Sequence, residues 1–475
     1  MGYPKVYPTG TTIYNPEKCF NGYTLFQANE HGAMLIDMNG REVRYWKGLQ
    51  GFPNKLLPNG NVFGSRGERD MQYAFQDQLD LVQVDWDGNI VWKFDRFEEV
   101  QDGDEAKRWV ARQHHDFQRE GNPVGYYIPG MESKTDSGKT LLLCHYEVHD
   151  DNVSDVDLID DTIIEVDWEG NILWRWNLVD HFDEIGFDDA AKETIRKRPE
   201  ILAALNKSDW AHINCASYLG PNKWFDAGDE RFNPENIIID SREANFMAII
   251  SHETGELVWK LGPDYTVDAP TRIIGMLIGM HHSHMIPKGL PGEGNIMVFD
   301  NGGWAGYGAP NIVSQHGTRA ARRDFSRVLE FDPTTLEIVW QYTPVEYGVA
   351  MPFLADQFYS PYISSAQRLP NGNTFIVEGS DGHFLEVTQD HEVVWEYISP
   401  YWGKVAIPTN MTYRAYRYPY EYAPQAEKPE EVAIPALNVQ NYRMPGAAPK
   451  GTAEPVIVEG LKGYGEVAGF CVESE

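Results

Sequence analysis

The sequence predicts an all-β fold, a six-bladed β-propeller with helical insertions and an extended C-terminal tail. One apolar strand–turn–strand phrase that ends in Trp recurs six times along the chain. A second apolar strand phrase, entered through a Pro, Asn and Gly turn, precedes several of the copies. The composition, 42% hydrophobic and 13% aromatic over 475 residues, supplies enough apolar surface for a large core.

The Trp-ending phrase has the marks of a β-hairpin. Alternating Val, Ile and Leu flank a polar turn, and four of the copies carry Gly at or beside the turn tip. The copies are MLIDMNGREVRYW (34–46), LVQVDWDGNIVW (81–92), IIEVDWEGNILW (163–174), MAIISHETGELVW (247–259), VLEFDPTTLEIVW (328–340) and FLEVTQDHEVVW (384–395). We expect the Trp of each copy to lie in the core.

The second phrase supplies two more strands for each unit, so each unit makes a four-stranded sheet. It reads NKLLPNGNVFG (54–64), GNIMVFDNG (294–302) and QRLPNGNTFIVEG (367–379). Six such sheets bury their faces by packing radially, which leaves only short edges. We therefore expect an N-terminal segment over 1–22, a propeller over 23–402, and an aromatic and Pro-rich tail over 403–475. The tail is expected to pack on the propeller or on a neighbouring subunit of a homo-oligomer.

Long spacings between copies predict insertions in several blades. Residues 98–113 are charged and are expected to form a helix, and residues 181–208 show helical periodicity with acidic residues early in the run. The acidic run EVHDDNVSDVDLIDD (147–161) lacks an EF-hand pattern, so we interpret it as a solvated loop rather than a calcium site. The arginines that follow, Arg319, Arg322, Arg323 and Arg327, are expected on the surface.

The net charge, the cysteines and the N-terminal sequence indicate which partners and which cellular compartment to expect. The formal net charge of −31 argues against nucleic acid and anionic membranes as partners. Four cysteines stand far apart and form no CxxC pair. The N-terminus shows no basic start followed by an apolar run, and no 18-residue apolar stretch occurs. We expect a cytoplasmic protein.

Histidines gather where the innermost strand of three blades should begin, near one mouth of the central channel. The stretches are RQHHDFQREGN (112–122), SDWAHINCASY (208–218) and GMHHSHMIPKG (279–289). Strand alternation puts His212 with Asn214 on one face, and His282 with His284. Because they replace the regular repeat at the same point of three blades, these side chains predict a site in the channel. A buried structural role remains open for each histidine, and one of the last three is expected to anchor its strand.

Several motifs together resemble the bacterial PAPS-independent arylsulfotransferases. They are HHD, DWAHIN, IIIDSREANFMAIISHETGELVWKLG, GNIMVFDNG and SAQRLPNGNTFIVEGSDGHFLEVTQDHEVVWEY, and the resemblance covers roughly residues 20–420. It implies a six-bladed propeller, in agreement with the repeat. It also implies transfer of a sulfuryl group from one phenol to another through a sulfohistidine, with no cofactor required.

The resemblance implies roles for particular residues. Catalytic roles fall on His115, His212 and Arg242, and the nucleophile falls on His281 or, with a slip of one residue, on His282. A neutral imidazole is a good nucleophile near neutral pH, and a guanidinium binds two sulfate oxygens at once. Substrate-binding roles are expected for Asn214, His284 and His114.

Two other classes of function remain open from the sequence. The first is a metal-dependent oxidoreductase, lyase or hydrolase that acts on a small aromatic or anionic substrate, with several histidines converging on copper, zinc or iron. Its ligands would come from His115, His212, His281, His282, His284, His316 and His383. The second is a propeller that binds a ligand without catalysis.

Overall fold

The structure is a computed structural model that describes residues 8–202, 205–349, 351–404, 408–438 and 446. The chain divides into two compact units, Met1–Pro435 and Ala436–Glu475. In the second unit the described residues, 436–438 and 446, form neither helix nor strand. The remainder of the predicted tail, 439–445 and 447–475, lies outside the described residues, so its predicted packing stays a prediction.

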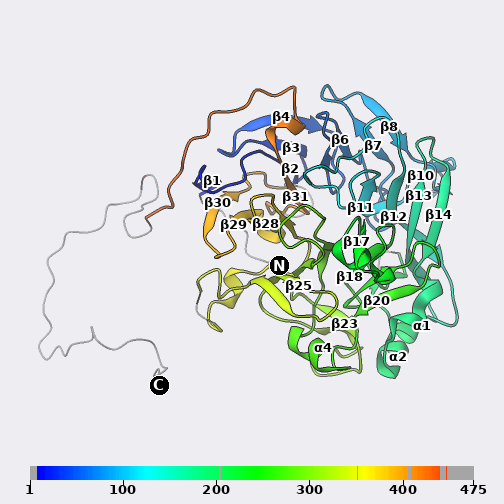
Figure 1. Ribbon diagram of the computed structural model, residues 1–475. Coiled ribbons are helices and arrows are strands. Elements are labelled where there is room, and N and C mark those ends of the chain that lie inside the picture. Colours follow the sequence, from blue (N-terminus) through cyan, green and yellow to red (C-terminus); the bar gives the residue numbers. More distant parts are fainter. Residues whose placement is uncertain (1–7, 203–204, 350, 405–407, 439–445, 447–475) are drawn as a thin grey trace, which may run out of the picture. The chain divides into compact units, whose positions relative to one another are not determined.

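Six antiparallel sheets surround a central channel in the first unit, which confirms the predicted six-bladed propeller (Figure 1). From the channel outward, the strands of blade one are β31 (Ala415–Tyr418), β2 (Tyr23–Ala28), β3 (Gly32–Ile36) and β4 (Glu42–Lys47). In the same order, the strands of blade two are β5 (Lys55–Leu56), β6 (Val62–Gly64), β7 (Leu81–Val84) and β8 (Ile90–Phe94). The strands of blade three are β11 (Gln113–Arg119), β12 (Thr140–Val148), β13 (Leu158–Val166) and β14 (Ile172–Asn177). Blade four has β17 (Ile213–Tyr218), β18 (Ile237–Ser241), β19 (Phe246–Ile250) and β20 (Leu257–Leu261); blade five, β21 (His281–Met285), β22 (Ile296–Asp300), β25 (Arg327–Phe331) and β26 (Ile338–Tyr342); and blade six, β27 (Ser365–Arg368), β28 (Thr374–Glu378), β29 (His383–Val387) and β30 (Val393–Ile398).

Both ends of the first unit take part in closing the ring of blades. Strand β31 pairs with β2 and so supplies the innermost strand of blade one from a segment beyond the predicted boundary at 402. Strand β1 (Gly10–Tyr14) pairs with β30 and adds a fifth strand to blade six. The propeller therefore reaches into both segments that the sequence assigned to termini, because a ring of sheets needs strands from both ends of the chain to join its first and last blades.

The Trp that ends each repeat ties its blade to the next one. Each indole N–H donates to a backbone carbonyl in the following blade, at N···O distances between 2.7 and 3.3 Å. The pairs are Trp46 with Asp85, Trp92 with Trp168, Trp174 with His252, Trp259 with Pro333, Trp340 with Gln389, and Trp395 with Met38. The last pair joins blade six to blade one, so six indoles complete a circle of hydrogen bonds around the propeller.

One predicted helical insertion is present and the other is not. Residues 98–113 were expected to be helical, but they contain the hairpin β9 (Glu98–Val100) and β10 (Arg108–Val110) and the start of β11. Helices do form within 181–208, as α1 (Phe182–Ile185) and α2 (Asp189–Lys197). The Asp188 side chain caps α2 by accepting from the N–H of Ala191.

The remaining elements lie outside the four-stranded blades. They are the strands β15 (Ile201–Leu202), β16 (Lys207–Asp209), β23 (Ala305–Tyr307) and β24 (Thr318–Ala321), the helices α3 (Lys223–Asp226) and α4 (Ala269–Ile274), and the 3-10 turns η1 (Val179–His181), η2 (Glu230–Phe232), η3 (Ala355–Gln357), η4 (Gly379–Asp381) and η5 (Tyr420–Tyr422). Strands β16 and β15 extend the sheet of blade three, in which β16 pairs in parallel with β13, and the other elements lie in loops around the blades.

The acidic run 147–161 is only partly the solvated loop that the sequence predicts. Residues 149–157 form the connection, but Asp160 and Asp161 lie within β13 and are fully buried. The carboxylates at the end of this run are therefore interior groups.

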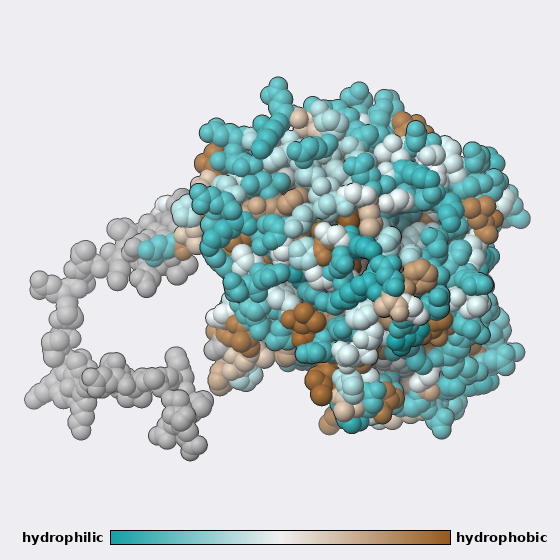
Figure 2. Space-filling model, in the orientation of Figure 1, coloured by the Kyte–Doolittle hydropathy of each residue, from teal (hydrophilic) through white to brown (hydrophobic). Residues whose placement is uncertain are grey.

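The face of the protein drawn in Figure 2 is largely polar. The face in Figure 2 is mainly hydrophilic, with apolar residues scattered across it rather than gathered in one patch. Among the residues that the structure describes, none of the helices has the length and apolar character that crossing a membrane would require.

A buried indole hydrogen bond of the circle should matter more than an exposed one. Trp395 is fully buried, so Trp395→Phe leaves the Met38 carbonyl without its partner and should lower the free energy of unfolding by about 1–3 kcal/mol. Trp340→Phe removes the equivalent bond at a solvent-exposed site and should cost less than about 1 kcal/mol. Urea unfolding followed by circular dichroism compares the two variants, and equal losses would contradict the expectation.

Candidate active site

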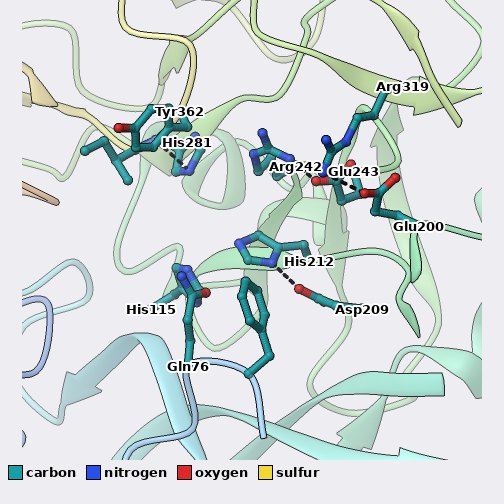
Figure 3. Close-up of a pocket in the computed structure, with 12 residues that line it drawn as sticks. Gln76, His115, Glu200, Asp209, His212, Arg242, Glu243, His281, Arg319 and Tyr362 are labelled. Carbon is teal, nitrogen blue, oxygen red and sulfur yellow. Dashed lines mark hydrogen bonds and ion pairs between the residues drawn. The ribbon is translucent and has the colours of Figure 1, made fainter. Parts of the chain in front are cut away.

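A cavity of about 220 Å³ opens at one mouth of the channel, where the predicted histidines meet (Figure 3). It is lined by Phe75, Gln76, His115, Glu200, Asp209, His212, Arg242, Glu243, His281, Arg319, Tyr362 and Ile363. Four of the five residues that the sequence predicted as catalytic, His115, His212, Arg242 and His281, are in this set.

Neighbouring blades position these side chains. His115 lies in β11 of blade three, His212 directly precedes β17 of blade four, and His281 begins β21 of blade five. Arg242 follows β18, and its backbone N–H donates to the backbone carbonyl of His212 at 3.0 Å. The innermost strands converge on the channel, so residues far apart in the chain share one cavity.

The backbone is locally distorted at one histidine in or beside the innermost strand of blades three, four and five. His115 and His212 have φ values of 53° and 50°, and the register of each strand shifts at or beside that residue. His282 in β21 has the same kind of backbone, with φ 56°. Left-handed backbone is unfavourable for a residue with a Cβ and collects at functional sites. The same distortion in three blades indicates that the channel mouth is built around it.

The imidazole of His281 has a defined tautomer. Asn301 donates from Nδ2 to the carbonyls of Ser360 and Ile363, both at 2.7 Å, which turns its Oδ1 toward His281. That oxygen lies 2.8 Å from His281 Nδ1, so Nδ1 must carry the proton. His281 Nε2 therefore holds the lone pair and accepts from the N–H of Ile363 at 3.1 Å. Burial, and then the nearby Arg242 cation, hold the pKa of His281 well below its usual range, so the ring is neutral.

The other two histidines face the same cavity with their Nε2 edges. The Nδ1 atom of His212 is bonded to Asp209, which leaves Nε2 as the lone-pair nitrogen. His115 Nδ1 lies 2.8 Å from His114 Nδ1. The His115 and His212 ring centroids are 4.6 Å apart, and Phe75 lies against His212. Burial, and then His212, keep the pKa of His115 well below its usual range.

Positive charge comes from two arginines, and the carboxylates of the cavity are all paired. Arg242 contacts Glu243, and Arg319 bonds to Glu200 at 2.7 Å. Burial, and then Arg319, lower the pKa of Arg242 to about 10, so it stays charged at neutral pH. The sequence placed Arg319 on the surface; the side chain is 48% exposed and yet reaches the cavity. Because each guanidinium is already paired with a carboxylate, an anionic group would bind to the remaining N–H groups of the two arginines.

A second cavity of about 540 Å³ shares a wall with the first one. Gln76, His115, Tyr362 and Ile363 line both of them. The second cavity adds aromatic and thioether surface from Phe52, Tyr413 and Met411, among others. The His115 ring lies between the two spaces and packs against Phe52 and Tyr413, with centroids 5.3 and 5.4 Å away. A flat aromatic molecule fits such a lining.

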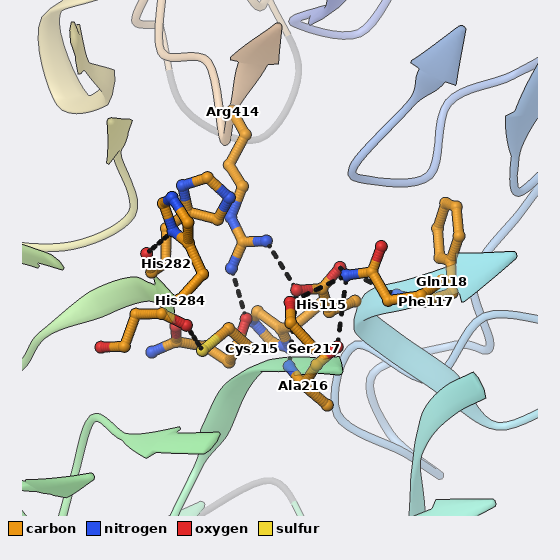
Figure 4. A network of polar contacts seen from close by, with 12 residues as sticks. His115, Phe117, Gln118, Cys215, Ala216, Ser217, His282, His284 and Arg414 are labelled. Carbon is orange, nitrogen blue, oxygen red and sulfur yellow. Dashed lines mark hydrogen bonds and ion pairs between the residues drawn. The ribbon is translucent and has the colours of Figure 1, made fainter. Parts of the chain in front are cut away.

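The other residues that the sequence placed at the site lie in neither cavity. Asn214 donates to the carbonyl of Met280 at 2.9 Å. His282 bonds through Nδ1 to the carbonyl of Ala366, and His284 through Nε2 to the Tyr126 hydroxyl. These rings border the polar network that fills the channel beneath the site, in which Arg414 bonds to Asp116 and to the carbonyl of Asn214 (Figure 4). Their positions suit structural roles better than contact with a substrate.

The seven histidines proposed as metal ligands do not share one position. His115, His212 and His281 line the first cavity, whereas His383 is held between Glu378 and Glu396, and His316 contacts Arg198 near the surface. Within the described part of the chain, the side chains close enough to share an ion are His114, His145 and Asp161.

Sequence reasoning missed Asn301, Tyr362 and Ile363. Asn301 belongs to the FDNG motif, which contributed only to the family resemblance and was given no role at the site, although its amide orients His281. Tyr362 and Ile363 come from the loop before β27, which no repeat covers. Only the positive φ of Ile363 and Ser364 marks this loop, and that signal needs coordinates.

A sequence profile of the arylsulfotransferase (ASST) family matches residues 123–418, more than half of the chain. The chain belongs to the arylsulfotransferase family. The match confirms the resemblance predicted from the motifs, and its range includes His212, Arg242 and His281 but begins after His115. A search of curated proteins finds no match.

Among solved structures, the chain is similar to a protein of unknown function from Bacteroides caccae, at 11% identity and a TM-score of 0.41, over 83% of this chain and 98% of the other. Further similar structures are a putative 6-phosphogluconolactonase from Bacteroides fragilis (10% identity, TM-score 0.34, 84% and 99% of the two chains) and virginiamycin B lyase from Staphylococcus aureus (9%, 0.32, 82% and 84%). These values are too low to bear on the function.

Arg242 should dominate the binding of an oxyanion in the first cavity. Arg242→Gln removes a buried positive charge and its charged hydrogen bonds, so the Kd for inorganic sulfate should rise about 10- to 100-fold. Arg231→Gln serves as the control, because Arg231 is exposed and bonds to Asp229 outside the cavity. Isothermal titration calorimetry measures both, and an unchanged Kd in Arg242→Gln would contradict the role given to this side chain.

Proposed function

We propose that the protein transfers a sulfuryl group between phenolic compounds through a sulfohistidine at His281. The observation that carries the proposal is the neutral imidazole of His281, which lines a cavity with Arg242, has its Nδ1 proton held by Asn301 and uses Nε2 to accept from the backbone N–H of Ile363. Membership of the arylsulfotransferase family supports the same chemistry. His282, the alternative nucleophile, lies outside both cavities.

The sulfate ester of the donor binds with its oxygens toward Arg242 and its ring toward the aromatic side. Arg242 shares its charge with Glu243 in the resting structure, and its remaining N–H groups are available to sulfate oxygens. His115 and His212 face the same space and supply polar contacts from the other side. Sulfuryl transfer, like phosphoryl transfer, depends chiefly on holding charge in position.

The first half-reaction forms the covalent intermediate. The Nε2 lone pair of His281 attacks sulfur, the N–S bond forms, and the S–O bond to the donor ring breaks. The donor phenolate leaves with the electron pair of that bond. Nδ1–H remains bonded to Asn301 Oδ1 throughout, which stabilises the positive charge that the sulfated ring acquires.

The second half-reaction returns the sulfuryl group to a phenol. An acceptor phenol enters from the larger, aromatic cavity, and His212 Nε2 takes its hydroxyl proton, with Asp209 stabilising the imidazolium that forms. The phenol oxygen attacks sulfur and the N–S bond breaks, which restores neutral His281. The proton on His212 then balances the phenolate released in the first half-reaction.

The loop before β27 controls access to the nucleophile. In the resting structure the N–H of Ile363 occupies the lone pair of His281 Nε2. Ile363 and Ser364 have φ values of 56° and 93°, which are unfavourable for both residues. We propose that the donor displaces this N–H when it binds and that release of the loop offsets part of the cost.

Substitution of the nucleophile should stop transfer and labelling together. His281→Gln keeps a polar side chain of similar size but has no nucleophilic nitrogen, so turnover of 4-nitrophenyl sulfate with a phenol acceptor should fall at least about 1,000-fold. Wild-type enzyme mixed with ³⁵S-labelled donor should retain label on the peptide that contains residue 281.

His282→Gln is the matched control, because it changes the adjacent ring without touching the cavity. It should retain label and most of its turnover. Label found on a peptide with His115 or His212, or full activity in His281→Gln, would overturn the assignment.

Asn301 should act through His281 rather than on the substrate. Asn301→Leu removes the shorter hydrogen bond of the Nδ1 proton and leaves it only the Gly279 carbonyl at 3.0 Å, so kcat should fall about 10- to 100-fold while KM for the donor stays within a few-fold. Steady-state kinetics on protein with native near-ultraviolet circular dichroism separates this effect from unfolding. A rise in KM with unchanged kcat would contradict a positioning role.

A further inference from the structure

The second cavity, the larger of the two at the channel mouth, is lined by carboxylates and carboxamides. Of the described residues that line it, none is a lysine or an arginine, whereas Glu30 and Glu68 bring carboxylates. Five carboxamides complete its polar lining, Gln27, Asn29, Gln50, Gln76 and Gln78. In the first cavity the carboxylates are matched by Arg242 and Arg319. The second cavity therefore favours a neutral or cationic molecule over an anionic one.

The loop of blade two between β6 and β7 brings Glu68 beside Gln78. The backbone at these two positions forms an antiparallel bridge, and residues directly opposite each other in such a bridge have their side chains on one face. The next pair along the loop, Arg69 and Asp77, lies on the other face and forms a buried ion pair at 3.3 Å. The alternation therefore presents Glu68 and Gln78 to the cavity and keeps the Arg69 cation away from it.

Two amide oxygens on this wall lack a hydrogen-bond donor within the described part of the chain. They are Gln76 Oε1 and Gln78 Oε1, and both atoms are buried. The Gln78 side chain is fixed, because the residue is 1% exposed and its Nε2 donates to the carbonyl of Gln76 at 3.3 Å. A Cβ at Gly51 would lie 2.5 Å from Gln78 Oε1, so the glycine leaves room beside this oxygen. Buried acceptors without donors are unfavourable, which indicates a ligand that brings N–H or O–H groups.

The same cavity also has an aromatic wall. The rings of Phe52 and Tyr413 pack against each other with centroids 4.8 Å apart, and both contact the ring of His115. Because His115 lines both cavities, a ring held on this wall borders the space around His281. A ligand in the second cavity thus meets aromatic faces and acceptor oxygens together.

We propose that the second cavity binds a phenol that carries a primary ammonium group. Its ring packs on Phe52 and Tyr413, and its ammonium N–H groups donate to Glu68 and Gln78. An ammonium group has three donors and a positive charge, so it matches acceptor oxygens beside a carboxylate better than a neutral hydroxyl does. That this phenol accepts the sulfuryl group rests on the proposed function, whereas its binding does not.

The ionisation of Glu68 decides the pH at which the binding is measured. Glu68 is exposed at the rim of the cavity, yet desolvation by the surrounding protein, and then Asp77, raise its pKa to about 7. A bound ammonium group favours the ionised carboxylate and so lowers this pKa. At about pH 8 the free carboxylate is mainly ionised and an alkylammonium group still carries its proton.

Titration calorimetry with tyramine, a phenol with an aminoethyl group, tests the binding without any turnover. Wild-type protein at this pH should bind about one tyramine per chain, at least about tenfold more tightly than 4-ethylphenol, which is similar in shape but uncharged. Glu68→Gln should weaken tyramine binding about five- to tenfold and leave the Kd for 4-ethylphenol within about twofold. Glu253→Gln is the matched control, because Glu253 is exposed in the turn between β19 and β20 and its loss removes the same charge outside both cavities.

Equal affinity of the wild type for tyramine and 4-ethylphenol would overturn the proposal, as would a Glu68→Gln variant that binds tyramine as tightly as the wild type does. Acceptor kinetics with 4-nitrophenyl sulfate as the donor separate this proposal from the proposed function. Equal kcat/KM for the two phenols would contradict the ammonium site and leave sulfuryl transfer standing. Tight, Glu68-dependent binding of tyramine without formation of any sulfate ester would support the ammonium site and contradict the proposed function.

Discussion

The closed circle of indole hydrogen bonds is the constraint on which the rest of the structure depends. Six Trp side chains each reach across to the next blade, and the last one, Trp395, returns to blade one at Met38. A ring closed in this way fixes the angle between neighbouring sheets, so the innermost strands arrive at the channel with their first residues close together. His115, His212 and His281 come from three different blades of this closed ring and line one cavity.

Chemistry at the channel mouth comes from deviations within an otherwise regular repeat. The innermost strands of blades three, four and five each break register and carry one histidine with left-handed backbone. The first two of these residues face the cavity, and the third, His282, faces the channel interior. Buried polar side chains bond to one another at and beneath the site, as in His281 with Asn301 and Arg414 with Asp116. Such buried networks make the position of each ring depend on its neighbours.

Periodic features of the sequence predicted the fold, and local motifs predicted much of the site. Six Trp-ending hairpins led to six blades, and the histidine stretches with Arg242 led to the residues that line the first cavity. The failures have one physical cause, which is contact between residues distant in sequence. The strand that completes blade one, Ala415–Tyr418, lacks the Trp phrase, and the pairing of Asn301 with His281 or of His114 with Asp161 exists only after the sheets pack. The segment 98–113 was predicted to be a helix because of its charge. A hairpin with exposed polar faces shows no strong alternation of apolar and polar residues that would have identified its strands.

The late position of the strand that completes blade one has a consequence for synthesis of the chain. Strand β2 ends at Ala28, and its inner partner begins at Ala415, about 390 residues later. A ribosome that adds about 5–20 residues per second needs roughly 20–80 s to cover that interval. Throughout that time the inner edge of β2 presents unpaired N–H and C=O groups, the kind of edge on which other strands add. The inner edge of β2 therefore stays open to pairing with other strands until β31 has been synthesised.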